Sequence, residues 1–257
     1  MKTIGIVLSG GGARGIAHLG VLEALGESGI KIDAIAGTSA GAIVAALFAA
    51  GNKPYHIKEL LKRNSYFGIS QLLINKEGIF KMDGLKYLLM QNIQAGQFEE
   101  LPIRLFVAAT NLNEGKSFIF EKGPLVEPVM ASASVPFLFE PIRWQGEEWV
   151  DGGILNNFPI EPLEQFCDLI IGSHVNKLGD PLPPRIADRK IHILEKCFHM
   201  AIAHTVYEKV SRCNLFLDPP ELSRYGMFDV RDADEIFEIG YRTACSNAKI
   251  QKHFILT

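Results

Sequence analysis

The feature that most constrains this chain is the alternation of short apolar runs with segments of helical periodicity. Short apolar runs bounded by Gly, Ser or Asp are typical of buried strands. We expect such strands at 4–8, 32–36, 103–109, 117–120, 148–150, 169–172 and 214–217. Helical patterns lie between several of them, at 16–27, 40–50, 55–63, 82–91, 188–210 and 233–249. The alternation predicts an α/β fold with a mostly parallel central sheet and helices on both faces.

Length and composition narrow the class of protein further. The 257 residues suit one large domain or two small ones, and 47% apolar residues exclude a disordered or fibrous chain. We find no internal repeat and no low-complexity linker, so we predict a single domain over 1–257. The 26 basic residues are balanced by 29 acidic ones, and a net charge of −3 gives no electrostatic footprint for nucleic acid.

Neither a targeting segment nor a membrane span is expected. The apolar run at 4–8 is shorter than the core of a signal peptide and ends in three glycines. The most apolar stretch, 34–51, is interrupted by Gly37, Thr38, Ser39 and Gly41, which favours a helix buried in a core over a span. The four cysteines, at 167, 197, 213 and 245, form no C-x-x-C pair and favour reduced thiols in a cytoplasmic protein.

The least regular part of the sequence is 52–100. Its leucine pairs between polar residues favour packing helices, and the alternative is a lid or a lipid-facing surface. The sequence does not decide between them.

A glycine-rich loop, Gly10-Gly11-Gly12-Ala13-Arg14-Gly15, joins the first expected strand to the first expected helix. Glycine lets backbone N–H groups approach a ligand closely, and the helix adds the positive end of its dipole. Such a loop suits a phosphate or the oxyanion of an acyl-transfer intermediate. It also matches the dinucleotide fingerprint G-x-G-x-x-G, but Asp33, the acidic residue nearest to the expected spacing, stands near the start of the second strand.

The second motif, Gly37-Thr38-Ser39-Ala40-Gly41, follows that second strand directly and matches G-x-S-x-G. Between a buried strand and a buried helix, this pattern predicts a nucleophile elbow with Ser39 at its tip. The N–H of Ala40 would then lie beside the incoming carbonyl oxygen. The bland alternative is a simple tight turn.

A third motif, Asp151-Gly152-Gly153, closes the segment 144–150. Asp-Gly is a routine turn dipeptide, so in isolation it indicates only a turn. A histidine base for Ser39 has one candidate at an expected strand end, His174, which equally fits a capped loop histidine. His199, His204 and Cys197 do not share a helical face, so we predict no metal site.

Together the three motifs resemble the patatin-like phospholipases. The segment 130–137, Met-Ala-Ser-Ala-Ser-Val-Pro-Phe, is similar to that family as well. The resemblance covers about 4–160, and 161–257 resembles less distinctly the C-terminal extension of small bacterial members. It implies a three-layer α/β/α sandwich, acyl lipid substrates, no cofactor, and room for transient contact with a membrane surface.

The resemblance also implies a dyad without histidine, with Ser39 as nucleophile and Asp151 as base. Arg14 matches the family's basic position, where it would steady the loop or a substrate phosphate. The implied oxyanion-hole or anion-binding positions are Gly10, Gly11, Gly12, Ala13, Arg14, Gly15 and Ala40, and the remaining motif positions are Gly37, Gly41, Gly152 and Gly153.

The sequence therefore supports three hypotheses about function. The first is a serine hydrolase of phospholipid or lysophospholipid esters. The second is a Ser-His acyltransferase or esterase that uses His174. The third is a nucleotide- or lipid-binding regulator without turnover.

Overall fold

A computed structural model describes residues 2–64, 82–136, 138–177, 200, 202, 206–227, 229–247 and 250. The strands are β1 (Ile4–Leu8), β2 (Ala34–Thr38), β3 (Arg104–Asn111), β4 (Lys116–Phe120), β5 (Ile142–Trp144), β6 (Glu147–Asp151), β7 (Leu169–Ser173) and β8 (Leu215–Leu217). The principal helices are α1 (Ile16–Glu27), α2 (Ala40–Ala49), α3 (Pro54–Asn64), α4 (Asp83–Asn92), α5 (Val126–Ser132), α6 (Leu163–Phe166) and α8 (Ala233–Cys245).

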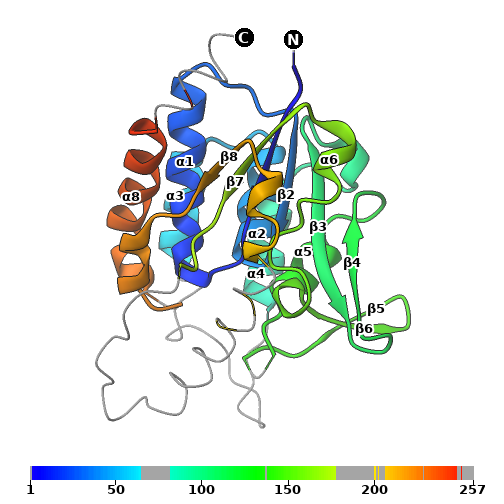
Figure 1. Ribbon diagram of the computed structural model, residues 1–257. Coiled ribbons are helices and arrows are strands. Elements are labelled where there is room, and N and C mark those ends of the chain that lie inside the picture. The colour runs from blue at the N-terminus through cyan, green and yellow to red at the C-terminus, as the bar shows by residue number, and fades with distance from the viewer. Residues whose placement is uncertain are drawn as a thin grey trace.

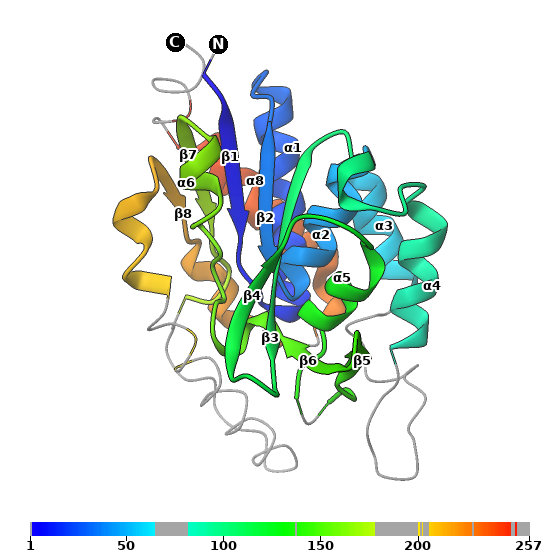
Figure 2. The ribbon, with the colours of Figure 1, turned by 90° about the vertical axis from the view of Figure 1, so that its right-hand side faces the viewer.

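One sheet holds all the described strands. Its parallel part runs β3-β2-β1-β7-β8, and three strands are antiparallel to their neighbours: β4 and β6 both pair with β3, and β5 pairs with β6. Figures 1 and 2 show this sheet between a thick layer that contains α1, α2 and α8 and a thinner layer that contains α6. The predicted three-layer α/β/α sandwich is confirmed.

Alternation along the strands separates two cores. Ile6 and Leu8 of β1 belong to the larger core with α1 and α2, whereas Val7 faces the smaller core, which contains Phe158. Because successive strand side chains point to opposite faces, an all-apolar strand such as β1 needs a helical layer on each side.

Most expected elements occur close to their predicted bounds, with instructive exceptions. The second strand begins two residues later than predicted and continues to Thr38, since Ile32 precedes the paired residues. The prediction missed α5, α6 and β5, and the last helix ends at Cys245 instead of 249. The helix predicted at 188–210 falls mainly outside the described residues. Residues 200, 202, 206 and 207 within it are helical, and a 3-10 turn, Val210–Arg212, begins at its predicted end.

The apolar stretch after Ser39 is buried in the larger core as α2, as predicted. In the irregular part of the sequence, α3 and α4 also pack their leucines into that core, whereas 65–81 lies outside the described residues. No helix in the described ranges is long and apolar enough to cross a membrane.

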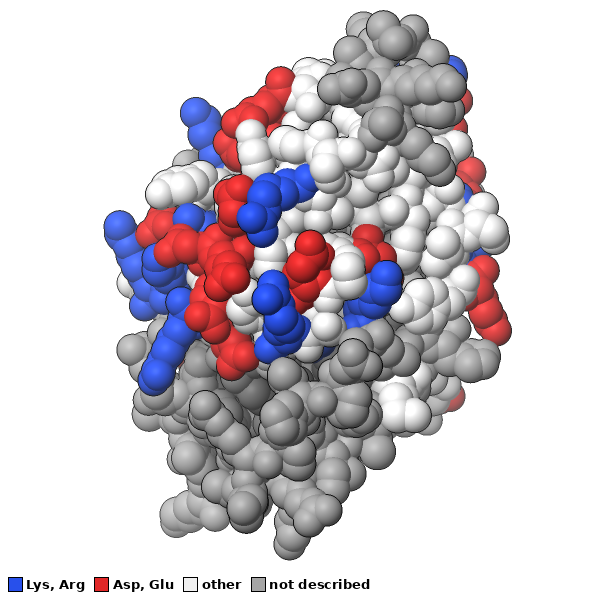
Figure 3. Space-filling view, turned by 60° about the vertical axis from the view of Figure 1, so that its left-hand side comes forward, with Lys and Arg blue, Asp and Glu red and all other residues white. Residues whose placement is uncertain are grey.

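Charged groups of both signs mingle on the face formed by α3 and α8. Lys58 of α3 lies 2.6 Å from Asp234 of α8, and Lys62 pairs with the same carboxylate. Figure 3 shows basic and acidic side chains side by side on this face, without a large area of one sign. The face therefore offers no basic patch for a nucleic acid.

Two glycines allow α1 and α8 to pack closely. A Cβ added at Gly20 would overlap the carbonyl oxygen of Phe237, and one added at Gly240 would overlap that of Ala17. The two helix backbones therefore touch where these residues face each other, and a methyl group there would force the helices apart.

We predict that Gly240→Ala destabilises the fold by about 1–3 kcal/mol, since overpacking outweighs the gain in helix propensity. The matched control is Gly26→Ala in α1, where an added Cβ meets nothing within 4 Å. That variant should gain up to about 1 kcal/mol. Urea unfolding of both variants measures the difference, and equal effects would contradict the close contact.

Candidate active site

The site is built where two strands meet end to end on one edge of β3. Val107 and Ala108 pair with both β2 and β4, so those strands lie on opposite edges. Ala109 to Asn111 pair with both β4 and β6, so β6 lies on the edge that β2 occupies. Thr38, the last residue of β2, pairs with Ala108, and Asp151, the last of β6, pairs with Ala109. The register thus brings the ends of two sequence motifs together.

Ser39 sits on the sharp turn between β2 and α2. Its φ of 55° and ψ of −124° are strained for a residue with a Cβ. The turn is held by a hydrogen bond of 2.9 Å from the Ser39 N–H to the Ser132 hydroxyl. The close packing behind it requires Gly41, because a Cβ there would lie 2.5 Å from the carbonyl oxygen of Leu8. This geometry is that of a nucleophile elbow.

Asp151 is a buried carboxylate, only 1% exposed. Its Oδ1 accepts a hydrogen bond of 2.7 Å from the Gly153 N–H, and its own N–H donates to the Ser134 carbonyl over 2.9 Å. Its Oδ2 accepts no hydrogen bond from the described residues. The Ser39 hydroxyl lies close enough to Asp151 to lower the pKa of its carboxyl group, but it does not meet hydrogen-bond geometry to Oδ2.

Burial dominates the acidity of Asp151. Loss of hydration raises the pKa of Asp151 to about 7, although the Ser39 hydroxyl and the Gly153 N–H both lower it. A carboxyl group with this pKa changes protonation near neutral pH, which is what a general base and acid requires.

The glycine-rich loop lies against the elbow. A Cβ at Gly10 would fall 3.0 Å from the Cβ of Ser39, and one at Gly15 would fall 2.7 Å from that of Ala40. The buried Arg14 directs Nε to the Gly11 carbonyl oxygen at 3.4 Å, so its side chain braces the loop from within.

The backbone N–H groups of the loop divide into used and unused donors. The Gly10 N–H donates to Asn157 Oδ1 over 3.1 Å, and the Ala13 N–H donates to the Met227 carbonyl over 2.8 Å. No hydrogen bond to a described residue engages the N–H groups of Gly11 and Gly12. Of the anion-binding positions implied by the sequence, these two have free donors in the loop.

Two asparagines that the sequence analysis missed flank the loop. Asn157 accepts the Gly10 N–H, and Asn176 donates Nδ2 to the Gly10 carbonyl oxygen. Both side chains are at most 2% exposed. The available signal was weak: each asparagine follows a strand-end motif by only a few residues, after Asp151 and after β7 respectively.

His174 does follow β7, as predicted, but it faces a different part of the molecule. Its fully buried ring donates or accepts through Nδ1 at 2.9 Å from Asp218 and stacks against Phe216. None of its contacts with described residues involves Ser39. A second buried imidazole, His18, contacts the Ser9 carbonyl and the Ser173 hydroxyl, and burial lowers the pKa of His18 to about 4.

The acidic residue required by a dinucleotide site is also misplaced. Asp33 lies at the amino end of β2, where its carboxylate accepts the Ile4 N–H over 2.8 Å. The glycine-rich loop follows the opposite, carboxyl end of β1, so Asp33 is not beside it. This argues against a ribose-binding role for Asp33.

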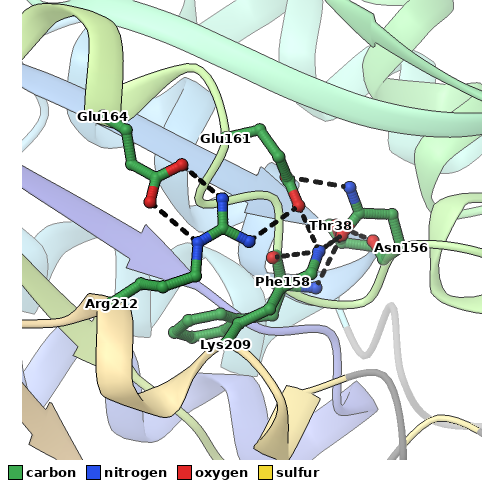
Figure 4. A network of polar contacts seen from close by, with 7 residues as sticks. All are labelled: Thr38, Asn156, Phe158, Glu161, Glu164, Lys209 and Arg212. Carbon is green, nitrogen blue, oxygen red and sulfur yellow. Dashed lines mark hydrogen bonds and ion pairs between the residues drawn. The ribbon is translucent and has the colours of Figure 1, made fainter.

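A polar network fastens the segment that follows Asp151 (Figure 4). Lys209 Nζ donates to Asn156 Oδ1 over 2.7 Å and to the Phe158 carbonyl over 3.0 Å, and it pairs with Glu161 over 2.5 Å. The Asn156 carbonyl in turn accepts the Thr38 hydroxyl over 2.9 Å. The network therefore connects a residue far along the chain to the neighbour of Ser39.

Metal ligands are not gathered in the described part of the chain, where no three His, Cys, Asp or Glu side chains form a cluster. The prediction of no metal site rested on three residues that lie outside the described part of the chain: Cys197, His199 and His204.

Fold and site define an α/β protein in which a serine on a strand–helix turn faces a buried carboxylate. The chain belongs to the patatin-like phospholipase family, whose model matches residues 6–164. The resemblance read from the motifs is thereby confirmed.

Similar proteins extend the comparison. An uncharacterised NTE family protein of Mycobacterium tuberculosis is 34% identical over 67% of this chain and 49% of its own length. Lysophospholipase NTE1 of Candida glabrata is 32% identical over 73% of this chain, which is 11% of that protein. VipD from Legionella pneumophila superposes with a TM-score of 0.52 at 19% identity, covering 93% of this chain and 67% of that one. The chain thus spans about half the length of the mycobacterial relative.

We predict that Asp151→Asn stabilises the fold at pH 8. The folded-state pKa is raised, so stability falls as pH rises from about 4 to about 7 and then stays level. Each raised unit corresponds to about 1.4 kcal/mol, so we expect a gain of roughly 2–4 kcal/mol at pH 8 that vanishes near pH 4. Thermal melts at both pH values measure it.

Asp168→Asn is the control, because the pKa of Asp168 is shifted in the opposite direction. Hydrogen bonds from Thr3 hold the pKa of the exposed Asp168 below its usual range, so its replacement should not stabilise the protein at pH 8. An Asp151→Asn gain that is equal at pH 4 and pH 8 would show that Asp151 carries an ordinary carboxylate.

Proposed function

We propose that this protein is a serine acyl hydrolase that cleaves the carboxylic esters of phospholipids or lysophospholipids through Ser39 and Asp151. The observation that carries the proposal is the register on β3, which places the strained Ser39 and the buried Asp151 at two abutting strand ends. Membership of the patatin-like phospholipase family and similarity to a fungal lysophospholipase support the lipid class of substrate.

The mechanism has two stages. Ser39 Oγ attacks the ester carbonyl carbon while its proton passes to the Asp151 carboxylate. As the tetrahedral intermediate collapses, the bond to the alcohol breaks and Asp151 returns the proton to the departing alkoxide. A water molecule then attacks the acyl-serine ester, again giving its proton to Asp151, and the fatty acid leaves as Ser39 regains its proton.

Negative charge develops on the carbonyl oxygen of the ester during the attack, so hydrogen-bond donors must already face that oxygen. The unused N–H groups of Gly11 and Gly12, and that of Ala40 at the start of α2, are the donors we assign to it. Each such donor is worth roughly 2.7–4 kcal/mol in comparable sites.

A lone carboxylate is a sufficient base here because burial changes its strength. An Asp with an ordinary pKa of 3.8 would take a serine proton poorly, whereas a pKa of about 7 brings its basicity close to that of imidazole. An alkoxide also leaves more readily than an amine, which favours esters over amides as substrates.

We predict that Ser39→Ala lowers kcat for a short-chain nitrophenyl ester and for lysophospholipid by at least ~10³-fold, with an unchanged melting temperature. The control is Ser28→Ala, whose hydroxyl bonds the Ala24 carbonyl at the far end of α1. Full labelling by a fluorophosphonate in the Ser39→Ala protein would overturn the assignment of the nucleophile. A wild type that neither labels nor cleaves any ester, but is stabilised by a nucleotide or lipid, would favour a binding protein.

We predict that kcat/KM rises with pH and levels off above about 7, because only the ionised form of Asp151 accepts the serine proton. Asp151→Asn should reduce kcat by roughly 10²–10⁴-fold. His174→Gln should leave unchanged both kcat and the midpoint of the pH dependence of kcat/KM. Activity that persists in Asp151→Asn but is lost in His174→Gln would replace the dyad with a Ser-His pair.

A further inference from the structure

Two buried asparagines hold the peptide groups on either side of the Gly10 Cα. Asn157 Oδ1 accepts the Gly10 N–H over 3.1 Å, and Asn176 Nδ2 donates to the Gly10 carbonyl oxygen. The two side chains come from different parts of the chain, since Asn157 follows Asp151 and Asn176 follows β7. The Gly10 N–H belongs to the Ser9–Gly10 peptide group, and the Gly10 carbonyl belongs to the Gly10–Gly11 peptide group. Neither of these two planes can rotate without breaking a hydrogen bond to a buried side chain.

The backbone partners fix the orientation of both amides. A backbone N–H can only meet the oxygen of Asn157, and a carbonyl oxygen can only meet the nitrogen of Asn176. That choice leaves Asn157 Nδ2 and Asn176 Oδ1 buried without a hydrogen-bond partner among the described residues. Burying such an atom without a partner destabilises the fold, and a purely structural contact would not require that cost.

Asn157 lies beside the reacting groups. A Cβ at Gly10 would lie 2.5 Å from Asn157 Oδ1 and 3.0 Å from the Ser39 Cβ. A Cβ at Gly153 would lie 2.9 Å from Asp151 Oδ1 and 3.0 Å from Asn157 Oδ1. Asn157 therefore stands between the glycine-rich loop, the elbow and the Asp151 turn.

We infer that Asn157 and Asn176 are positioning residues that lock the peptide planes on either side of Gly10. The Gly11 N–H, which shares a plane with the Gly10 carbonyl, thereby stays fixed as an oxyanion donor. The inference rests on the proposed function, since it assigns the loop to the oxyanion. Gly11 and Gly12 have no side chains to hold them, and their N–H groups make no hydrogen bond to a described residue. The direction of each N–H is set by the carbonyl in the same peptide plane. Asn176 holds the Gly10 carbonyl and with it the Gly11 N–H, and Arg14 holds the Gly11 carbonyl and with it the Gly12 N–H. Donors preorganised in this way cost no reorganisation during the reaction.

The test replaces each asparagine with leucine, which keeps the approximate volume and removes the hydrogen bond. Asn157→Leu and Asn176→Leu should each lower kcat for a nitrophenyl ester by roughly 10–100-fold, with KM changed less than threefold. The Ki of a trifluoromethyl ketone, which forms a hemiketal oxyanion on Ser39, should rise by the same factor as kcat falls. A purely structural role would not couple these two quantities.

Asn52→Leu is the matched control. Its Nδ2 donates to the Leu47 and Asn92 carbonyls at the far end of α2, so it loses the same kind of hydrogen bond away from Ser39. The melting temperature of this variant should fall while its kcat stays unchanged. Asn157→Asp adds a second readout: it keeps an acceptor for the Gly10 N–H but places a negative charge near Asp151, so the midpoint of the pH profile should rise.

The outcomes separate the two proposals. If Ser39→Ala is inactive while both asparagine variants keep the kcat and Ki of Asn52→Leu, the positioning role is wrong and the hydrolase proposal stands. If the wild type has no serine-dependent turnover, the hydrolase proposal fails and the inference fails with it.

Discussion

The site depends on the unequal lengths of β2 and β3. Along their shared edge β2 pairs with β3 only as far as Ala108, which leaves the last three residues of β3 open on that side. The antiparallel strand β6 fills the opening, and it must end where β2 ends. Because the two strands run toward each other, their final residues meet, and one is followed by Ser39 while the other is Asp151. A parallel partner at this position would have placed the carboxylate at the far end of the strand.

Burial at this junction has a chemical use and a structural cost. It raises the pKa of Asp151 to about 7, which makes the carboxylate a competent base but removes stability at neutral pH. The polar network of Lys209 acts in the other direction. Burial alone would raise the pKa of Glu161, but the hydrogen bond and charge of Lys209 outweigh it and hold that pKa below its usual range. The ion pair therefore stabilises the fold at neutral pH, and this contribution is lost only as the pH falls.

The sequence predicts the local parts of this design and misses the long-range ones. The first strand, the glycine-rich loop and the Ser39 turn can be predicted because each is a contiguous sequence pattern with a local physical cause. The sequence analysis predicts a single strand at 148–150 in place of the hairpin of β5 and β6. Its turn consists of Gln145 and Gly146, and only Gly146 is a usual turn residue, since Gln145 rarely adopts its positive φ of 55°. The grip of Asn157 and Asn176 on Gly10 joins residues more than 140 positions apart, and no local pattern encodes such a contact.

The family model ends at residue 164, yet the geometry of the site does not. Three contacts from beyond that point reach the motifs: Asn176 holds the Gly10 carbonyl, Met227 accepts the Ala13 N–H, and Lys209 fastens the segment after Asp151. The contacts of Asn176 and Met227 replace partners that a loop of small residues cannot supply for itself, because glycine has no side chain with which to satisfy or orient its own backbone. The motifs supply the reacting groups, and the later part of the chain supplies the constraints that hold them still. Variation after residue 164 can therefore tune the oxyanion loop and the carboxylate without altering any motif residue.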